Sequence, residues 1–277
     1  MTVIFGLLAA VSVGTSDFLG GLSSRRADPV AVTASSNFVG FGLAFVAAWV
    51  AAGEATVVDM AWGVLGGAGL VGGLVALYAG YARTRVSVAA PVAGVGAAAL
   101  PVIAASLLGE ESLSTRATAG ILLGLVAIGL VSVSRSDQQG SIGSSLLYGL
   151  GGAVGIGLLL LCLSRTSEDG GLWPIVAARG SGSIVLGLFI AVTRVPRPLP
   201  RAVWPHVVGI AALVTAGNAL FLAATRVGST SVAAVLTSLF TAVTVFWAWL
   251  VFRERLRRVQ AAGLGLALVA VALIAAG

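Results

Sequence analysis

The sequence is built almost entirely from apolar stretches long enough to cross a lipid bilayer. A membrane-spanning helix needs about 20 apolar residues, and stretches bounded by charge, proline or glycine predict ten such helices. Lipid offers no hydrogen-bond partners to an open backbone, so each stretch is expected to be an α-helix. The expected helices cover residues 3–22, 29–52, 60–81, 86–108, 114–134, 142–164, 172–193, 203–224, 230–251 and 259–276.

The charge content is too low for a water-soluble domain. Only 9% of the 277 residues are charged and 58% are hydrophobic, whereas soluble domains carry about 25% charged residues. Ten helices would use about 200 residues and leave only short loops. The composition therefore predicts an all-α polytopic membrane protein with ten transmembrane helices and no soluble domain.

An internal repeat divides the chain into two halves. A shift of 143 residues places Arg83 on Arg226 and Glu111 on Glu254. Charged residues are scarce here, so two matched charges at one offset carry weight. We expect a first repeat in residues 1–134 and a second in residues 142–277. Because each half holds five spans, the second half must insert in the opposite orientation.

The arginines follow the same inversion. The odd-numbered connections between the expected helices hold twelve arginines, and the even-numbered connections, counted with the first turn of the helix that follows, hold three. Arginine-rich loops usually remain on the cytoplasmic side. The pattern predicts a multi-pass protein of the cell membrane with both termini on the non-cytoplasmic side.

A short motif occurs once in each half. It is a Glu-x-Leu sequence with glycine nine residues after the glutamate, at Glu111, Leu113 and Gly120 and again at Glu254, Leu256 and Gly263. This double motif resembles the hallmark of the EamA-like transporters of the drug/metabolite transporter superfamily, and Pro174 followed by Arg179 is similar to the family's second-helix pattern. The resemblance implies ten helices, two EamA repeats and transport of small metabolites, often outward.

Inverted halves suit a transporter that alternates access around a shared midplane site. We expect a secondary, ATP-independent transporter of small metabolites, amino acids or drugs, working as an exporter with possible proton coupling. One alternative is an uptake or facilitative carrier for a sugar or nucleoside. A second alternative is a membrane scaffold that transports nothing.

Asp17 is the most informative candidate residue, and the EamA family usually has no acid at its position. It falls within the first expected helix, where an unpaired charge costs about 2.5–3.5 kcal/mol at mid-bilayer. It could bind a proton or a substrate amine. Alternatively, it could reach interfacial water or pair with Arg25 or Arg26.

Arg179 is the second intramembrane charge. A guanidinium fits carboxylates and phosphates, but it could instead extend to the headgroup layer. Further polar side chains could line a cavity, or bond only to their own or a neighbouring helix. These candidates are Asn37, Tyr78, Tyr81, Asn218, Thr237, Ser238 and Trp247. A structural role at helix ends is expected for Arg83, Glu111, Arg226 and Glu254.

Glycine spacing predicts where helices pack closely. Three Gly-x-x-x-Gly motifs, of the type that lets membrane helices approach each other, begin at Gly63, Gly69 and Gly151. We expect close backbone contact at these sites.

Other functions are not expected from the residues. The single cysteine, Cys162, and the single histidine, His206, provide neither a disulfide nor a metal site. No phosphate-binding loop indicates an ATPase. The scattered arginines do not resemble a nucleic-acid interface. We therefore expect no enzyme activity and no cofactor. The expected partners are the lipid bilayer and a small-molecule substrate, with protons as a candidate coupling ion, in a monomer or homodimer.

Overall fold

The computed structural model describes residues 1–107, 114–132, 141–163, 165–167, 169–193, 198–227, 236–237, 239–252 and 258–275. All regular structure within these ranges is helical. The helices are α1 (Thr2–Ser24), α2 (Pro29–Ala51), α3 (Val57–Arg83), α4 (Val86–Leu107), α5 (Thr115–Ser132), α6 (Ile142–Leu163), α7 (Trp173–Thr193), α8 (Trp204–Arg226), α10 (Phe240–Phe252) and α11 (Arg258–Ala275), with a short 3-10 helix η1 (Arg201–Val203) before α8.

The apolar stretches predicted the helices well. Across the described ranges, α1, α2, α3, α6, α7 and the segment containing α8 are long and apolar enough to cross a membrane, and shorter apolar helices lie in α4, α5, α10 and α11. The chain is therefore an all-α multi-pass membrane protein. The ten-span inverted repeat stays a prediction, and the expected start of the helix at residue 230 lies outside the described ranges.

Polar caps fix two helix starts. Asp28 accepts a hydrogen bond from the Val30 backbone N–H at 2.8 Å, and Pro29 opens α2. Helix α3 begins three residues earlier than the apolar pattern predicts. There the Thr56 hydroxyl accepts from the Asp59 N–H, and the Asp59 carboxylate accepts from the Thr56 N–H.

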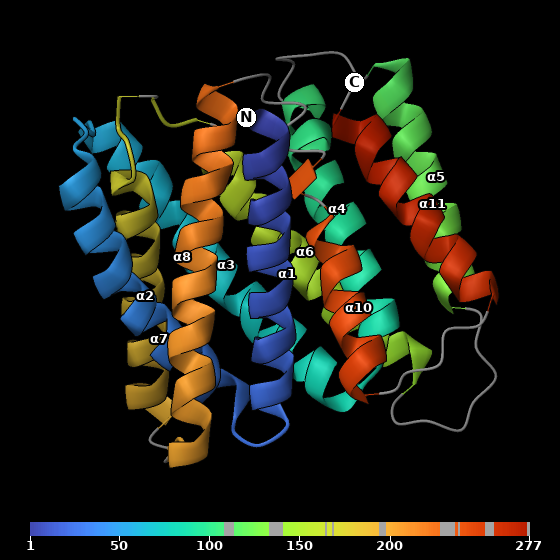
Figure 1. Ribbon diagram of the computed structural model, residues 1–277, viewed down its shortest axis with the longest axis horizontal. Coiled ribbons are helices and arrows are strands. Elements are labelled where there is room, and N and C mark those ends of the chain that lie inside the picture. The colour runs from blue at the N-terminus through green and yellow to red at the C-terminus, as the bar shows by residue number, and fades with distance from the viewer. Residues whose placement is uncertain are drawn as a thin grey trace.

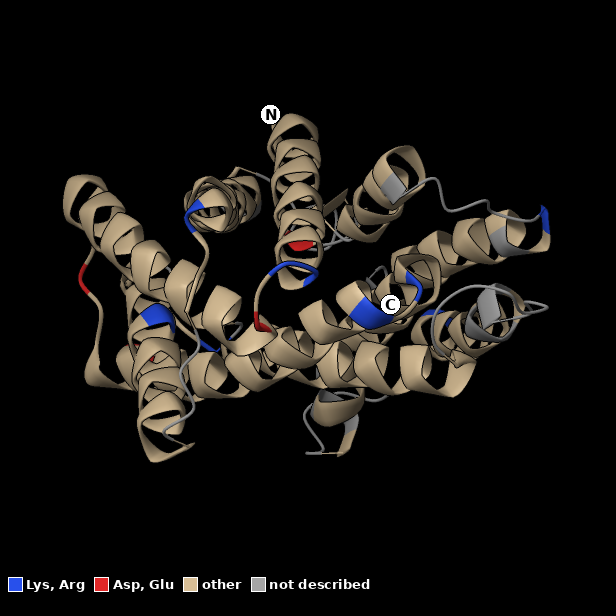
Figure 2. Ribbon diagram, turned by 90° about the horizontal axis from the view of Figure 1, so that it is seen from below, with Lys and Arg blue, Asp and Glu red and all other residues tan. Residues whose placement is uncertain are grey.

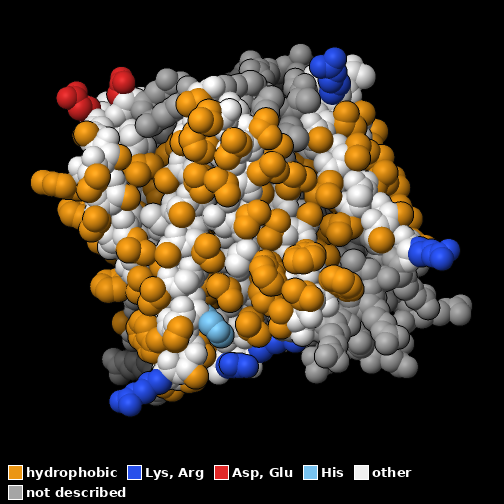
Figure 3. Space-filling model, viewed as in Figure 1, with side chains coloured by type: hydrophobic (Ala, Val, Ile, Leu, Met, Phe, Trp, Pro, Cys, Tyr) orange, Lys and Arg blue, Asp and Glu red, His pale blue; other side chains and the backbone are white. Residues whose placement is uncertain are grey.

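The helices run between two chemically different ends of the molecule. Helix α1 begins, and α11 ends, at one end (Figure 1). The α1–α2 and α3–α4 connections and η1 lie at the other end and contain several arginines, as the view from that side shows (Figure 2). We call this the Arg-rich end, and the other the opposite end. Hydrophobic side chains cover most of the lateral face between them, as a lipid-facing surface requires (Figure 3).

Glycine brings helices into close contact, as the motifs predict. Helix α3 packs along α6 and α7. A Cβ added at Gly73 would lie 2.7 Å from the Gly155 Cα atom, and one at Gly67 would overlap the Ala178 backbone. The absence of side chains therefore sets the distance between these helices.

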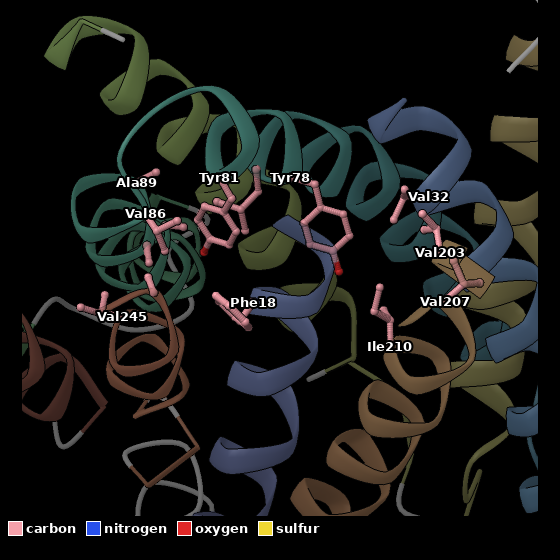
Figure 4. Packing of buried hydrophobic residues seen from close by; sticks show 14 residues of the cluster. Phe18, Val32, Tyr78, Tyr81, Val86, Ala89, Val203, Val207, Ile210 and Val245 are labelled. Atoms are coloured by element: carbon pink, nitrogen blue, oxygen red, sulfur yellow. The ribbon is translucent and has the colours of Figure 1, made fainter. Parts of the chain in front are cut away.

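A hydrophobic cluster fills the Arg-rich end, and we call it the end cluster. It joins side chains from α1, α2, α3, α4, η1, α8 and α10 (Figure 4). Its larger members are Phe18, Val32, Leu77, Tyr78, Tyr81, Val86, Val203, Val207, Ile210 and Val245. It packs α1 against α3, α8 and α10 at this end.

Candidate functional site

Asp17 lies in the interior, at the border of the end cluster. Its side chain is 4% exposed, and its Oδ2 atom is buried without a hydrogen-bond partner. Residues three and four positions apart share a helix face, so Asp17 lies on the same face of α1 as Gly20 and Gly21. These glycines face α3: a Cβ at Gly21 would lie 2.5 Å from the Tyr81 Cβ, and one at Gly20 would overlap the Tyr78 ring.

Two tyrosines accompany the carboxylate. Tyr78 and Tyr81 are 1% and 0% exposed, and the Tyr81 hydroxyl is buried without a partner. Asp17 lies close enough to both phenols to interact with them electrostatically. Both rings project from α3 toward α1 (Figure 4). The structure thus brings three of the predicted site residues into one polar group within an apolar end.

The alternatives for Asp17 do not describe its surroundings. The carboxylate is buried, so it does not reach interfacial water. Arg25, the C-cap residue of α1, donates from Nη2 to the Tyr81 carbonyl oxygen at 3.4 Å. Within the described ranges, Asp17 has neither a hydrogen bond to Arg25 nor one to Arg26.

Arg179 is also buried and does not extend to the headgroup layer. It is 5% exposed. Its Nη1 atom donates to Asn37 Oδ1 at 3.2 Å, and Asn37 Nδ2 donates to the Arg179 carbonyl oxygen at 2.8 Å and to Ser183 Oγ at 3.2 Å. Its Nη2 atom is buried without a partner. Arg179 also interacts electrostatically with Tyr78, which thus interacts with both intramembrane charges.

Trp247 joins α10 to α1. Its indole N–H donates to Thr15 Oγ1 at 3.0 Å, and its ring stacks on Phe18 with centroids 6.2 Å apart. One turn earlier, the Thr244 hydroxyl donates to the Gly14 carbonyl oxygen at 3.1 Å. The sequence did not single out Thr15 or Thr244. Gly14 is the feature of the sequence that could have indicated this contact, because an added Cβ there would overlap the α10 backbone.

The remaining candidates are distributed more widely. Thr237 and Thr215 each have a buried hydroxyl without a partner, and Thr215 was not predicted. Asn218 is half-buried in α8, and Arg83 is exposed at the end of α3. Four predicted features lie outside the described part: Ser238, Glu111, Glu254 and the Arg226 side chain.

The buried polar atoms of the site belong to carboxylate, guanidinium and hydroxyl groups. Within the described ranges, no three His, Cys, Asp or Glu side chains are grouped so that they could hold a metal ion. Cys162 is a buried free thiol. In these ranges the Asp17 carboxylate, the Arg179 guanidinium and several hydroxyls each have a buried atom without a hydrogen-bond partner.

Comparison with known proteins agrees with this architecture. A solved protein structure superposes with a TM-score of 0.67 at 16% identity, covering 98% of this chain and 95% of that chain. This likeness shows a shared fold. No curated protein matches the sequence. The model of the EamA-like transporter family matches residues 143–276. This match assigns residues 143–276 to the EamA-like transporter family, and so to the drug/metabolite transporter superfamily.

Proposed function

We propose that the protein is a secondary transporter that exports small metabolites, amino acids or drugs by alternating access. We further propose that Asp17 binds a proton or a substrate amine. The observation that carries this proposal is that four of the predicted site residues have a buried polar atom without a partner: Asp17 Oδ2, Tyr81 OH, Arg179 Nη2 and Thr237 Oγ1.

Unpartnered buried groups are costly. An unsatisfied polar group costs about 1–3 kcal/mol, and more when it is charged. A protein that retains several of them in one interior gains if another state of its cycle satisfies them. Protonation, a bound substrate or water would do so at Asp17, and an anionic substrate group would do so at Arg179.

The packing supports alternating access. The end cluster fills the Arg-rich end and joins helices of both halves of the chain. Transport would require this cluster to separate while the opposite end closes, which is the exchange expected of inverted repeats. If arginines mark the cytoplasm, the structure corresponds to a state closed toward the cytoplasm.

Flux measurements test the proposal. Purified protein in liposomes would be given a radiolabelled amino-acid mixture or ethidium, with and without a pH gradient. We expect flux that depends on the protein and is driven by the gradient. Asp17→Asn should abolish the gradient dependence, whereas the matched control Glu54→Gln, at an exposed position, should behave like the wild type.

Two results would contradict the proposal. Gradient-driven flux unchanged by Asp17→Asn would remove Asp17 from the mechanism. Equilibrating flux of sugars or nucleosides without any effect of the gradient would favour a facilitative carrier instead.

A further inference from the structure

We infer that the protein rests in the state closed at the Arg-rich end because its two halves carry different residues at equivalent gate positions. The Arg-rich end closes through two glycines against two tyrosines. The equivalent positions in the sequence of the second half hold a leucine and a serine in place of the two glycines, and a phenylalanine and an alanine in place of the two tyrosines. This inference rests on the proposed alternating access and adds which state predominates without substrate.

The contact at the Arg-rich end depends on missing side chains. Helix α1 packs on α3, with Gly20 under the Tyr78 ring and Gly21 under the Tyr81 Cβ. A Cβ at Gly20 would overlap the Tyr78 ring, so any other residue there would displace the ring or separate α1 from α3. The two tyrosines are fully buried as a result.

The repeat offset assigns the matching residues at the opposite end. A shift of 143 residues places Gly20 on Leu163 and Tyr78 on Phe221. It also places Gly21 on position 164, a serine, and Tyr81 on position 224, an alanine. Helices α6 and α8 therefore correspond to α1 and α3. In the described ranges α6 packs along α3 and α4, and it makes no comparable contact with α8.

The difference in volume makes the two closures unequal. If α8 approached α6 as α3 approaches α1, the Leu163 side chain would occupy the place where the Phe221 ring must fit. Close-packed interiors do not accept an added side chain without displacing a neighbour. Closure at the opposite end is then looser or rarer, and the population shifts toward closure at the Arg-rich end.

Cysteine accessibility tests this bias without knowledge of the substrate. The parent is the full chain with Cys162→Ala, in nanodiscs, treated with a water-soluble maleimide. Val207→Cys reports on the end cluster, where Val207 is 0% exposed. Leu160→Cys reports on the C-terminal half of α6, toward the opposite end. In the repeat, Leu160 is the position equivalent to Asp17. We expect Leu160→Cys to react at least about tenfold faster than Val207→Cys.

Two variants should shift the bias. Gly20→Ala should separate α1 from α3, which speeds the labelling of Val207→Cys and slows that of Leu160→Cys. Leu163→Gly should produce the same shift by allowing α8 onto α6, and it keeps the test valid if Gly20→Ala fails to fold. Gly72→Ala is the matched control, because nothing lies within 4 Å of a Cβ added there.

The outcomes separate this inference from the proposed function. Faster labelling of Val207→Cys than of Leu160→Cys in the parent would overturn the inference, as would rates that neither Gly20→Ala nor Leu163→Gly changes. Intact gradient-driven transport beside either result would leave the proposed function standing. A labelling bias that shifts as expected, in a protein without transport, would contradict the proposed function alone.

Discussion

Asn37 and Arg179 hold each other across the two halves of the chain. The amide of Asn37 donates to the Arg179 backbone carbonyl at 2.8 Å, and the guanidinium returns a bond to the amide oxygen at 3.2 Å. Each residue thus satisfies part of the hydrogen-bonding capacity of the other inside an apolar bundle. The pair joins α2 to α7 and orients the guanidinium, whose Nη2 atom keeps its hydrogen-bonding capacity.

Replacing Asn37 should show how much the stability of the protein depends on its bonds to Arg179. Asn37→Ala leaves the buried guanidinium without its side-chain acceptor, and such a loss costs about 1–3 kcal/mol. Unfolding in mixed detergent micelles would measure the change. Asn218→Ala is the control, because Asn218 is half-buried and makes no hydrogen bond in the described ranges; its effect should stay within about 0.5 kcal/mol. Equal stability of the two variants would contradict a bridging role for Asn37.

Asp59 joins two connections at the opposite end. Its Oδ1 atom accepts from the Ser167 backbone N–H at 2.6 Å. Its Oδ2 atom accepts from the Ser167 hydroxyl at 2.9 Å and from the Thr56 hydroxyl at 2.7 Å. Asp59→Asn replaces one acceptor oxygen by a donor, so we expect a measurable loss of stability.

The same unfolding assay would measure the Asp59 variant. Glu54→Gln is the matched carboxylate-to-amide control, because Glu54 is exposed and its backbone N–H, not its side chain, bonds to Asp169. A loss for Glu54→Gln as large as that for Asp59→Asn would show that the network at Asp59 is not the cause.

Close packing of α3 on α7 gives a third prediction. A Cβ at Gly67 would overlap the backbone of Ala178, and backbone cannot rotate away. Gly67→Ala should therefore destabilise the protein by about 1–3 kcal/mol. Gly187→Ala on α7 meets nothing within 4 Å and should be neutral within about 0.5 kcal/mol. Comparable unfolding of the two variants would contradict the close contact.

The sequence predicts the helices and the tight contacts because both depend on local composition. Apolar length locates spans, and glycine spacing predicts the α3 contacts with α6 and α7. Helix α3 began earlier than predicted because Thr56 and Asp59 cap it, and hydropathy does not register a cap.

The partners within the site could not be predicted in the same way. The sequence singled out Asp17, Tyr78 and Tyr81, but only the fold places Gly20 and Gly21 under the tyrosines. The sequence left open whether Arg179 extends to the headgroups or stays in the interior. In the structure its guanidinium bonds in the interior to Asn37, a residue 142 positions away. Such pairings depend on which helices adjoin, which composition does not encode.

The bond between Trp247 and Thr15 gives a fourth prediction. Interhelical hydrogen bonds in membranes average about 0.6 kcal/mol and reach about 1.7 kcal/mol, so a coupling in this range is expected between Trp247→Phe and Thr15→Val. A double-mutant cycle measures it, because the loss of indole packing on Phe18 cancels. Strict additivity of the two variants would show that the bond contributes nothing to stability.

The orientation of the bundle gives a final prediction. Glu54 is exposed near the opposite end and Arg201 is exposed at the Arg-rich end. Arginine-rich loops stay in the cytoplasm, so an impermeant maleimide on intact cells should label Glu54→Cys in the Cys162→Ala background. It should label Arg201→Cys only after permeabilisation. The reverse pattern would invert the assignment of both termini, and the closed end cluster would then face outward.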